Sequence, residues 1–276
     1  MTGQFAGEVA VVTGAGRGFG KAIALRFARE GAAVTFTSRT RAELDRAVAE
    51  AEGAGARALA VPGDVTELRD VDRVVAATEA RFGPVTLLVS NAGVPGPFGP
   101  LWLVDPEAWW AAQQVHIRAP FLYIRRVVPG MIERRAGRII IVSALASRLV
   151  APYLSAYCTG KIAQTRITAE LAAETKGLGV SIFAIDPGFV YTGIAEETMN
   201  SPDAQRWLPG MVARIRERRD SPHRETDLAR CTQRCLDLAS GRYDALTGRY
   251  MELDDDIEAM RREALAGTAA SGTATR

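Results

Sequence analysis

Residues 13–20 read Thr-Gly-Ala-Gly-Arg-Gly-Phe-Gly and join an apolar run, Val9–Thr13, to an amphipathic run, Gly18–Arg29. The first run predicts a buried strand, and the second, with Ile23 and Phe27 on one face, predicts a helix. Glycines at such a junction let the backbone approach a pyrophosphate, which the N-terminus of the following helix stabilises. The stretch therefore predicts a dinucleotide-binding βαβ unit at the start of the chain.

The same alternation of short β-branched runs and longer amphipathic runs continues along the chain. Further strands are expected at residues 33–37, 59–61, 87–89, 139–142, 180–185 and 247–253. Strands this apolar, separated by helices, are typical of a parallel sheet that is covered on both faces. We therefore expect an α/β, doubly wound Rossmann fold with a seven-stranded, mostly parallel sheet and helices on both faces.

Two local patterns mark helix starts. Thr40 and Glu43 have the spacing of a capping box, in which each side chain bonds the backbone at the other position. Asp105-Pro106-Glu107 combines an N-cap residue, a proline at the first helical position and an acid in the first turn. Both patterns predict helices that begin directly after them.

Composition limits the class of protein. The 276 residues carry 34 Lys and Arg against 32 Asp and Glu, a net charge of +2 with no basic block, which argues against a nucleic-acid partner. We see no signal-peptide pattern and no apolar run that would span a bilayer, and the three cysteines suggest a reducing compartment. We expect a cytoplasmic protein without nucleic-acid or membrane partners.

The pattern shows no linker or internal repeat, so a single domain is expected over residues 1–266. Residues 267–276 are small and polar, and we expect a disordered tail there. Cys231 and Cys235 lie one helical turn apart but lack further Cys or His partners. They are interpreted as small core residues, and no metal site is expected.

Tyr157-Cys158-Thr159-Gly160-Lys161 lies in a predicted helix, where the phenol and the ammonium share one face. A neighbouring cation favours the phenolate, so the pair is a candidate general acid/base near neutral pH. Lys161 is one of only three lysines among 34 basic residues. A chain that otherwise uses arginine has kept at this position a compact ammonium whose pKa shifts readily.

Together with the glycine loop, these residues resemble the motifs of a known protein family. Thr-Gly-x-x-x-Gly-x-Gly at 13–20 resembles the glycine motif of the short-chain dehydrogenases/reductases (SDRs). Further SDR-like motifs follow in order: Asp64-Val65, Asn91-Ala92-Gly93, Tyr157-x-x-x-Lys161, and Pro187-Gly188 with Thr192. The resemblance extends to about residue 253. It implies one SDR domain with a substrate lid at about 188–219, and assembly as a homodimer or homotetramer.

The resemblance also implies a nicotinamide cofactor. Asp64 would hold the adenine, the carbonyl of Asn91 would lie near the adenosine ribose, and residues 187–192 would flank the nicotinamide. Each motif also has a structural alternative, such as a helix cap for Asp64, a turn at 91–93 and a strand end at 187–188. The implied cofactor residues are Gly14, Gly16, Arg17, Gly18, Phe19, Gly20, Ser38, Arg39, Asp64, Val65, Asn91, Ala92, Gly93, Tyr157, Lys161, Pro187, Gly188, Val190 and Thr192.

The end of the second predicted strand bears on the choice of cofactor. Ser38 stands where NAD-preferring members of the family usually carry Asp, and Arg39 follows it. We expect Arg39 and Arg17 to converge on a ribose 2′-phosphate, which guanidinium groups bind through paired hydrogen bonds. NADP(H) is therefore expected to be preferred. NAD(H) stays open, because both arginines can also be interpreted as solvated surface residues.

Two catalytic positions depart from the family pattern. Ala144 falls at the position of the usual catalytic serine, and Ser143 comes one residue early, where a strand side chain faces the other way. Ser143 either replaces that serine or bonds nearby backbone. His116 falls at the position of the Asn that supports a water-linked proton relay. It either relays protons itself or is a buried histidine bonded to a backbone carbonyl.

The resemblance implies an NADP(H)-dependent oxidoreductase that interconverts a carbonyl and an alcohol, with Tyr157 as general acid/base, Lys161 tuning it, and His116 and Ser143 assisting. The apolar lid favours a bulky hydrophobic small molecule, aromatic or polyketide-like. Its contacts are expected at Ala144, Leu145, Tyr153, Phe189 and Trp207. The alternatives are a non-redox enzyme on the same scaffold (isomerase, dehydratase or cyclase) and a non-catalytic NADP(H)-binding protein.

Overall fold

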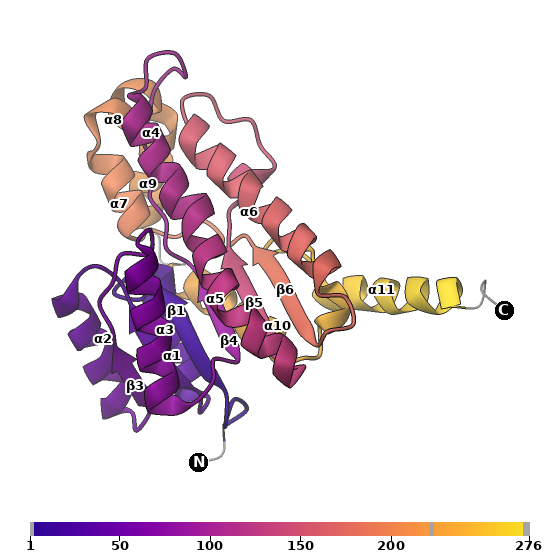
Figure 1. Cartoon of the computed structure of the whole chain (residues 1–276). Helices are drawn as coiled ribbons and strands as arrows, with labels where there is room; N and C mark the ends of the chain where they lie inside the picture. Colours follow the sequence, from indigo (N-terminus) through magenta and orange to yellow (C-terminus); the bar gives the residue numbers. More distant parts are fainter. Residues whose placement is uncertain (1–2, 221–223, 273–276) are drawn as a thin grey trace.

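The computed structural model describes residues 3–220 and 224–272, and its centre is a seven-stranded sheet in the order β3-β2-β1-β4-β5-β6-β7 (Figure 1). Every pair of neighbouring strands in this sheet is parallel. The strands are β1 Val9–Thr13, β2 Ala33–Thr37, β3 Arg57–Ala60, β4 Leu87–Ser90, β5 Gly137–Val142, β6 Val180–Ile185 and β7 Tyr250–Met251. The expected α/β, doubly wound Rossmann fold is confirmed.

Helices cover both faces of this sheet (Figure 1). In chain order they are α1 Gly18–Arg29, α2 Arg41–Gly53, α3 Leu68–Phe82, α4 Pro106–Gln113, the π-turn η1 Gln114–Arg118, α5 Ala119–Arg134, the 3₁₀ turn η2 Leu145–Ser147, α6 Ser155–Glu174, α7 Gly193–Asn200, α8 Pro202–Trp207, α9 Pro209–Arg219, α10 Arg224–Ala239, the 3₁₀ turn η3 Asp244–Leu246 and α11 Ile257–Gly272.

The two faces have separate cores because successive strand side chains point in opposite directions. Ala10 and Val12 of β1 pack with α1, α2 and α10, whereas Val11 packs with α3, α5 and α6. This explains why the strands are largely apolar, as parallel strands buried on both sides are. Cys231 and Cys235 lie in the first of these cores with exposed fractions of 0%.

Three local expectations need correction. Strand β7 is shorter than the expected 247–253, because Gly248 has a positive φ of 85° and the chain turns there before pairing with β6. Thr40 does precede α2, but its side chain makes no cap hydrogen bond. The tail was expected to be disordered from Gly267, whereas α11 continues through Gly272; residues 273–276 lie outside the described part. Alanines at 266, 269 and 270 favour this continuation.

The other cap prediction is confirmed, since the Asp105 carboxylate accepts from the main-chain N–H of Ala108 at 2.7 Å. Within residues 3–220 and 224–272, no group of three or more His, Cys, Asp or Glu is placed to hold a metal ion. None of the helices described is both long and apolar enough to cross a membrane.

Gly160 allows α6 to pack closely against η1. A Cβ atom at this position would lie 2.5 Å from Cβ and 2.7 Å from Cγ of His116, closer than real Cβ contacts. Both atoms sit near the backbone of η1, so the clash cannot be relieved by a small rotation of a flexible side chain. The glycine between Tyr157 and Lys161 therefore sets the distance between the two segments.

We predict that Gly160→Ala destabilises the protein by about 2 kcal/mol, because a contact this short puts the overpacking penalty at the upper end of its range, about 3 kcal/mol, against a helix-propensity gain of roughly 1 kcal/mol. The matched control is Gly210→Ala in α9, where an added Cβ meets nothing within 4 Å and stability should stay equal or rise. Denaturant unfolding measures both variants. Equal stability of Gly160→Ala and wild type would contradict the close approach.

Candidate active site

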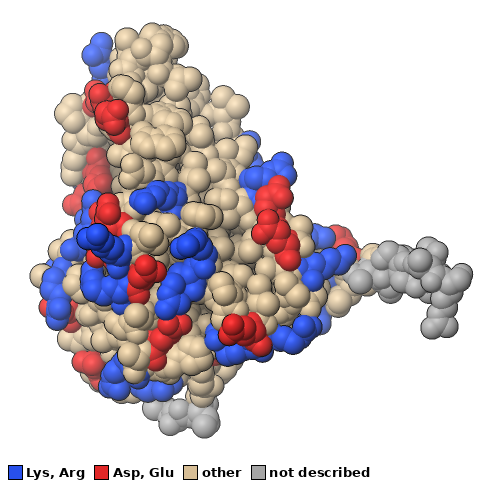
Figure 2. All heavy atoms as spheres, viewed as in Figure 1, with Lys and Arg blue, Asp and Glu red and all other residues tan. Residues whose placement is uncertain are grey.

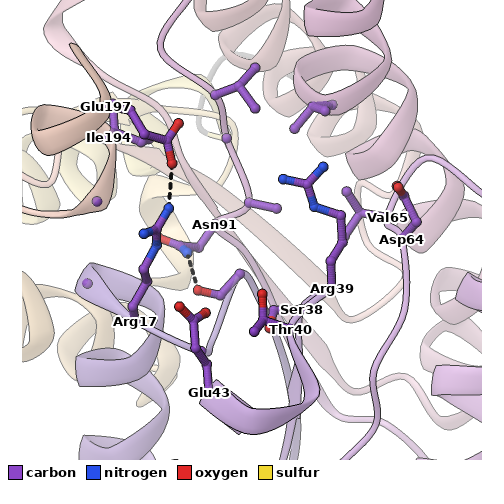
Figure 3. A pocket seen from close by; sticks show the side chains of 18 of the residues that line it. Arg17, Ser38, Arg39, Thr40, Glu43, Asp64, Val65, Asn91, Ile194 and Glu197 are labelled. Carbon is purple, nitrogen blue, oxygen red and sulfur yellow. Dashed lines mark hydrogen bonds and ion pairs between the residues drawn. The ribbon is translucent and has the colours of Figure 1, made fainter. Parts of the chain in front are cut away.

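A cavity of about 430 Å³ opens at the carboxyl ends of β1, β2 and β4 (Figure 3). The chain runs from β1 to one edge of the sheet through β2 and β3, and then returns to β4 on the other side of β1. Such a switch point is where open α/β sheets bind ligands. The walls include the predicted cofactor residues Gly14, Gly16, Arg17, Gly18, Phe19, Ser38, Arg39, Asp64, Val65, Asn91, Ala92, Gly93 and Thr192.

The glycine loop fits a tightly held diphosphate. Gly14 and Gly18 have positive φ values of 64° and 59°, conformations that side-chain-bearing residues rarely adopt. A Cβ on Gly20 would lie 2.3 Å from the carbonyl oxygen of Gly14. The loop therefore keeps its main-chain N–H groups close to the N-terminus of α1, where an anion is stabilised.

Polar side chains tie the neighbouring loops together. The Asn91 amide donates to the main-chain carbonyl of Thr13 at 2.9 Å, and the main-chain N–H of Asn91 donates to the Thr13 hydroxyl at 2.9 Å. The Asp64 carboxylate accepts from the N–H and the hydroxyl of Thr66, at 2.9 and 2.7 Å. Both side chains thus have structural roles as well as a place in the cavity wall.

The adenosine end of the cavity differs from expectation. Arg17 does not converge with Arg39: its guanidinium forms an ion pair with Glu197 of α7, while Arg39 lies on the opposite side of the cavity (Figure 3). The local reason is that Glu197 offers a carboxylate across the loop. The Ser38 hydroxyl is buried and has no hydrogen-bond partner in the described part of the chain, which fits a ligand oxygen at this point.

Six predicted cofactor residues lie outside the walls of this cavity: Gly20, Tyr157, Lys161, Pro187, Gly188 and Val190. Tyr157 and Lys161 are both on α6, and the Lys161 ammonium is 5.5 Å from the centre of the Tyr157 ring. The ammonium donates to the main-chain carbonyl of Val142 at 2.9 Å. This bond turns the lysine toward the carboxyl end of β5.

The electrostatics of the pair correct an expectation. Burial lowers the pKa of Lys161 to about 7. Burial also raises the pKa of Tyr157 well above its ordinary value, and the negative charge of Asp186 raises it further. The phenol is therefore protonated at neutral pH in this structure, and the lowered phenol pKa expected beside a cation is not present.

Ser143 and Ala144 follow β5, as the sequence indicates. The Ser143 hydroxyl is buried and donates to the main-chain carbonyl of Lys161 at 3.1 Å. This is the backbone-bonded alternative, and any role toward a substrate would require Ser143 to leave this bond. Ala144 is extended, with φ −169° and ψ 161°, at the entry to η2.

His116 lies in η1 with an exposed fraction of 0%. Its Nε2 lies 2.9 Å from the carbonyl oxygen of Val94 and so carries the proton, while Nδ1 is buried without a partner among the residues described. Burial and the nearby Lys161 charge lower the His116 pKa to about 3, so the ring is neutral. It meets the Tyr157 ring edge-on with centroids 5.4 Å apart, an arrangement that fits the buried structural alternative.

An apolar cluster joins the lid to Tyr157. Buried Phe98, Leu154, Ala204 and Val212 pack with partly buried Ala151, Tyr157, Cys158, Met199, Leu208 and Met211. Beside this cluster the Tyr153 and Trp207 rings lie 5.4 Å apart. Of the other expected substrate contacts, Leu145 and Phe189 remain 39% and 43% exposed. Helices α7, α8 and α9 thus place apolar side chains in the same cluster as the Tyr157 ring.

Residues 8–203 match the family described as short chain dehydrogenase. The chain belongs to this family. It is 33% identical over 268 residues to a short chain dehydrogenase of Pseudocercospora fijiensis, covering 95% of this chain and 85% of that protein. It is also 34% identical over 202 residues to 2-(S)-hydroxypropyl-CoM dehydrogenase 3 of Xanthobacter autotrophicus, covering 73% and 79%.

Solved structures agree with the assignment. A variant actinorhodin polyketide ketoreductase crystallised with NADPH is 26% identical to this short-chain dehydrogenase, with a TM-score of 0.78 over 91% of this chain and 97% of that chain. Levodione reductase, at 23% identity, shares the fold with a TM-score of 0.81 over 91% and 97%. The chain is thus an oxidoreductase of a family that binds nicotinamide cofactors.

Sequence reasoning missed four residues of this short-chain dehydrogenase. Glu43 and Glu197 line the cavity, and the Asp186 carboxylate accepts from the main-chain N–H groups of Leu145 and Gly188, joining the loops after β5 and β6. Gln164 contacts Lys161. Of these four, only Gln164 could have been found from the sequence, because a residue three positions after Lys161 lies on the same face of a helix.

Proposed function

We propose that the protein is an NADP(H)-dependent oxidoreductase of the cytoplasm that interconverts a carbonyl and an alcohol on a bulky hydrophobic small molecule. The observation that carries the proposal is the placement of Tyr157 and Lys161 on one face of α6, beneath an apolar lid. The three free cysteines support a reducing compartment. The exposed apolar side chains of Leu145 and Phe189 support a hydrophobic substrate.

When bound, the nicotinamide supplies or accepts the hydride. Tyr157 is protonated at neutral pH because its pKa is raised, and it gives this hydroxyl proton to the carbonyl oxygen in reduction. Lys161 is an ammonium below its pKa of about 7, and in that form it donates hydrogen bonds beside the phenol. Tyr157 packs partly buried against the apolar cluster, and Lys161 is 3% exposed, so little water reaches the ammonium.

A non-redox reaction is the second candidate. Ala144 supplies no hydroxyl, and Ser143 already bonds the carbonyl of Lys161. Losing one donor to a developing oxyanion costs on the order of 100- to 1,000-fold in rate, which slows a reductase without abolishing it. An isomerase, dehydratase or cyclase would need only the acid/base function of Tyr157. A non-catalytic NADP(H)-binding protein ranks last, because it has no use for the Tyr157–Lys161 pair.

We predict that NADPH is oxidised with at least some members of a panel of bulky ketones, and that Tyr157→Phe lowers kcat by at least about 100-fold because the proton donor is lost. Ser143→Ala is the comparison and should change kcat less than about tenfold, since its hydroxyl serves α6. NADPH absorbance and mass spectrometry of products measure both. Bound NADPH that no substrate oxidises would refute the redox proposal, and product formed without net cofactor turnover would favour the non-redox one.

The preference for NADP(H) is supported by charge at the adenosine end. Arg39 lines the cavity beside the unpartnered Ser38 hydroxyl, and no acid occupies position 38. Glu43 lies close by, since a Cβ on Gly16 would be 2.8 Å from its carboxylate and 3.0 Å from the Ser38 hydroxyl. A 2′-phosphate would therefore gain Arg39 and face one opposing charge.

We predict that Arg39→Ala weakens NADPH binding by about 10- to 100-fold, because a hydrogen bond to a charged group is worth roughly 1.5–3 kcal/mol, and leaves NADH binding nearly unchanged. Isothermal titration calorimetry measures both affinities. Arg41→Ala is the matched control, because Arg41 is exposed and pairs with Asp45 outside the cavity. Equal losses for NADPH and NADH would count against a 2′-phosphate contact.

We also propose a homodimer or homotetramer formed through α4, α5 and α6. These helices carry the exposed apolar side chains Trp110, Phe121 and Ile162, each more than half exposed. Figure 2 shows few charged residues over the part of the surface that α4 and α6 form. A partner subunit would remove this apolar area from water.

Light scattering should give a mass two or four times 29.6 kDa for the wild type. Phe121→Glu should lower it, because the interface would then bury an unpaired charge. Val150→Glu, at a 96% exposed position outside these helices, should leave the mass unchanged. A wild-type mass of 29.6 kDa would contradict the proposal.

A further inference from the structure

Gln164 occupies a buried position between two groups of the active site. Its Oε1 lies 3.2 Å from Nζ of Lys161, and its Nε2 lies 3.0 Å from the main-chain carbonyl oxygen of His116. Gln164 is 1% exposed, Lys161 3% and His116 0%. A single side-chain amide thus spans the distance from the lysine on α6 to the backbone of η1.

The chemistry of both ends fixes the orientation of this amide. An ammonium has only donors and a main-chain carbonyl only acceptors, so the amide must present oxygen to Lys161 and nitrogen to His116. Glutamate would set an acceptor against the His116 carbonyl, and methionine would satisfy neither end. Glutamine therefore has both the length and the arrangement of donor and acceptor that the space between Lys161 and the His116 carbonyl requires.

The donor that an α-helix would offer to the His116 carbonyl is absent. In an α-helix its partner would be the main-chain N–H four residues on, but that residue is Pro120, which has no N–H. Gln164 supplies the donor instead. The side chain of Gln164 thus donates to the carbonyl to which Pro120 cannot donate, although the two residues lie 44 positions apart in sequence.

The same bond fixes the lysine. In the described part of the chain, Lys161 gives one of its three hydrogens to the Val142 carbonyl and one to Gln164, which leaves the third for a bound ligand. We propose that Gln164 is a positioning residue that links the Lys161 ammonium to the His116 carbonyl through its own side chain, in the place where a water-linked relay would otherwise run, and so holds the ammonium charged and aimed.

The groups around Lys161 set the direction of the effect. Asp186, after β6, raises the lysine pKa by its charge, and burial lowers it, for a pKa of about 7. His116 from η1 and Tyr157 from α6 are both neutral near pH 7. An acceptor at Gln164 favours the charged lysine, so its removal should lower the lysine pKa and a carboxylate there should raise it.

The decisive measurement does not require turnover. The chain has three lysines, Lys21, Lys161 and Lys176, so protein labelled with ¹³C at the lysine ε-carbon gives few NMR signals, and loss of one in Lys161→Met assigns the signal of interest. We expect that signal to titrate about 1–2 pH units lower in Gln164→Met than in the wild type, and higher than the wild type in Gln164→Glu.

Thr168→Val is the matched control. Thr168 is buried one turn further along α6, and among the residues described its hydroxyl bonds only the main-chain carbonyl of Gln164, so its removal should leave the lysine titration in place. A purely structural role of Gln164 predicts lower thermal stability in both Gln164 variants and no opposite movement of the titration. Titration midpoints that agree with the wild type in both Gln164 variants would overturn the proposal. If one variant fails to fold, the sign of the shift in the other decides alone.

The inference rests on the proposed reductase for its functional meaning, and a second readout separates the two. In reduction, the rate should fall as pH rises through the lysine pKa, because the ammonium is lost, and Gln164→Met should move this fall to lower pH. An NMR shift in a protein that reduces no carbonyl would sustain the role of Gln164 and refute the reductase. An unmoved NMR signal in an active reductase would refute the role of Gln164 and sustain the reductase.

Discussion

A lysine ammonium that is 3% exposed must find acceptors within the protein, because desolvation of an unpaired charge is expensive. In this short-chain dehydrogenase, Lys161 finds them in the carbonyl of Val142 at the end of β5 and in the amide of Gln164. The bond to Val142 requires α6 to lie close to the sheet, and the bond from Gln164 to the His116 carbonyl requires it to lie close to η1. Gly160 makes the approach to η1 possible by lacking a Cβ. Burial of one cation therefore fixes the separation of the elements that build the site.

Much of the fold was predictable from the sequence because its signals are local. Strands β1, β2 and β6 have the predicted bounds, since residues buried on both faces leave short runs that are rich in apolar and β-branched residues. Glu43 shows where local reasoning stops. Its spacing from Thr40 predicts a capping box, yet its carboxylate lies next to Ser38 and the glycine loop. A tertiary neighbour thus took the place of the local partner.

The candidate site was predictable as a set of motifs but not as a set of contacts. The glycine loop, Asp64 and Asn91 were identified from spacing, and the structure brings them around one cavity. The ion pair of Arg17 with Glu197 joins residues 180 positions apart, which no sequence periodicity reports. The pKa directions of Tyr157 and Lys161 were equally out of reach, because burial dominates both and depends on the complete packing.

The ion pair between the glycine loop and α7 makes Glu197 and any anion that binds Arg17 compete for the same guanidinium. A phosphate group that takes Arg17 must release Glu197, so opening of α7 strengthens anion binding, and bound anion favours opening by the same factor. Both side chains are about half exposed, at 52% and 49%. Exposed pairs contribute at most about 1 kcal/mol, or roughly fivefold in an equilibrium constant, and added salt weakens them. The ion pair between α7 and the glycine loop is thus weak enough for an incoming ligand to replace it at little cost in free energy.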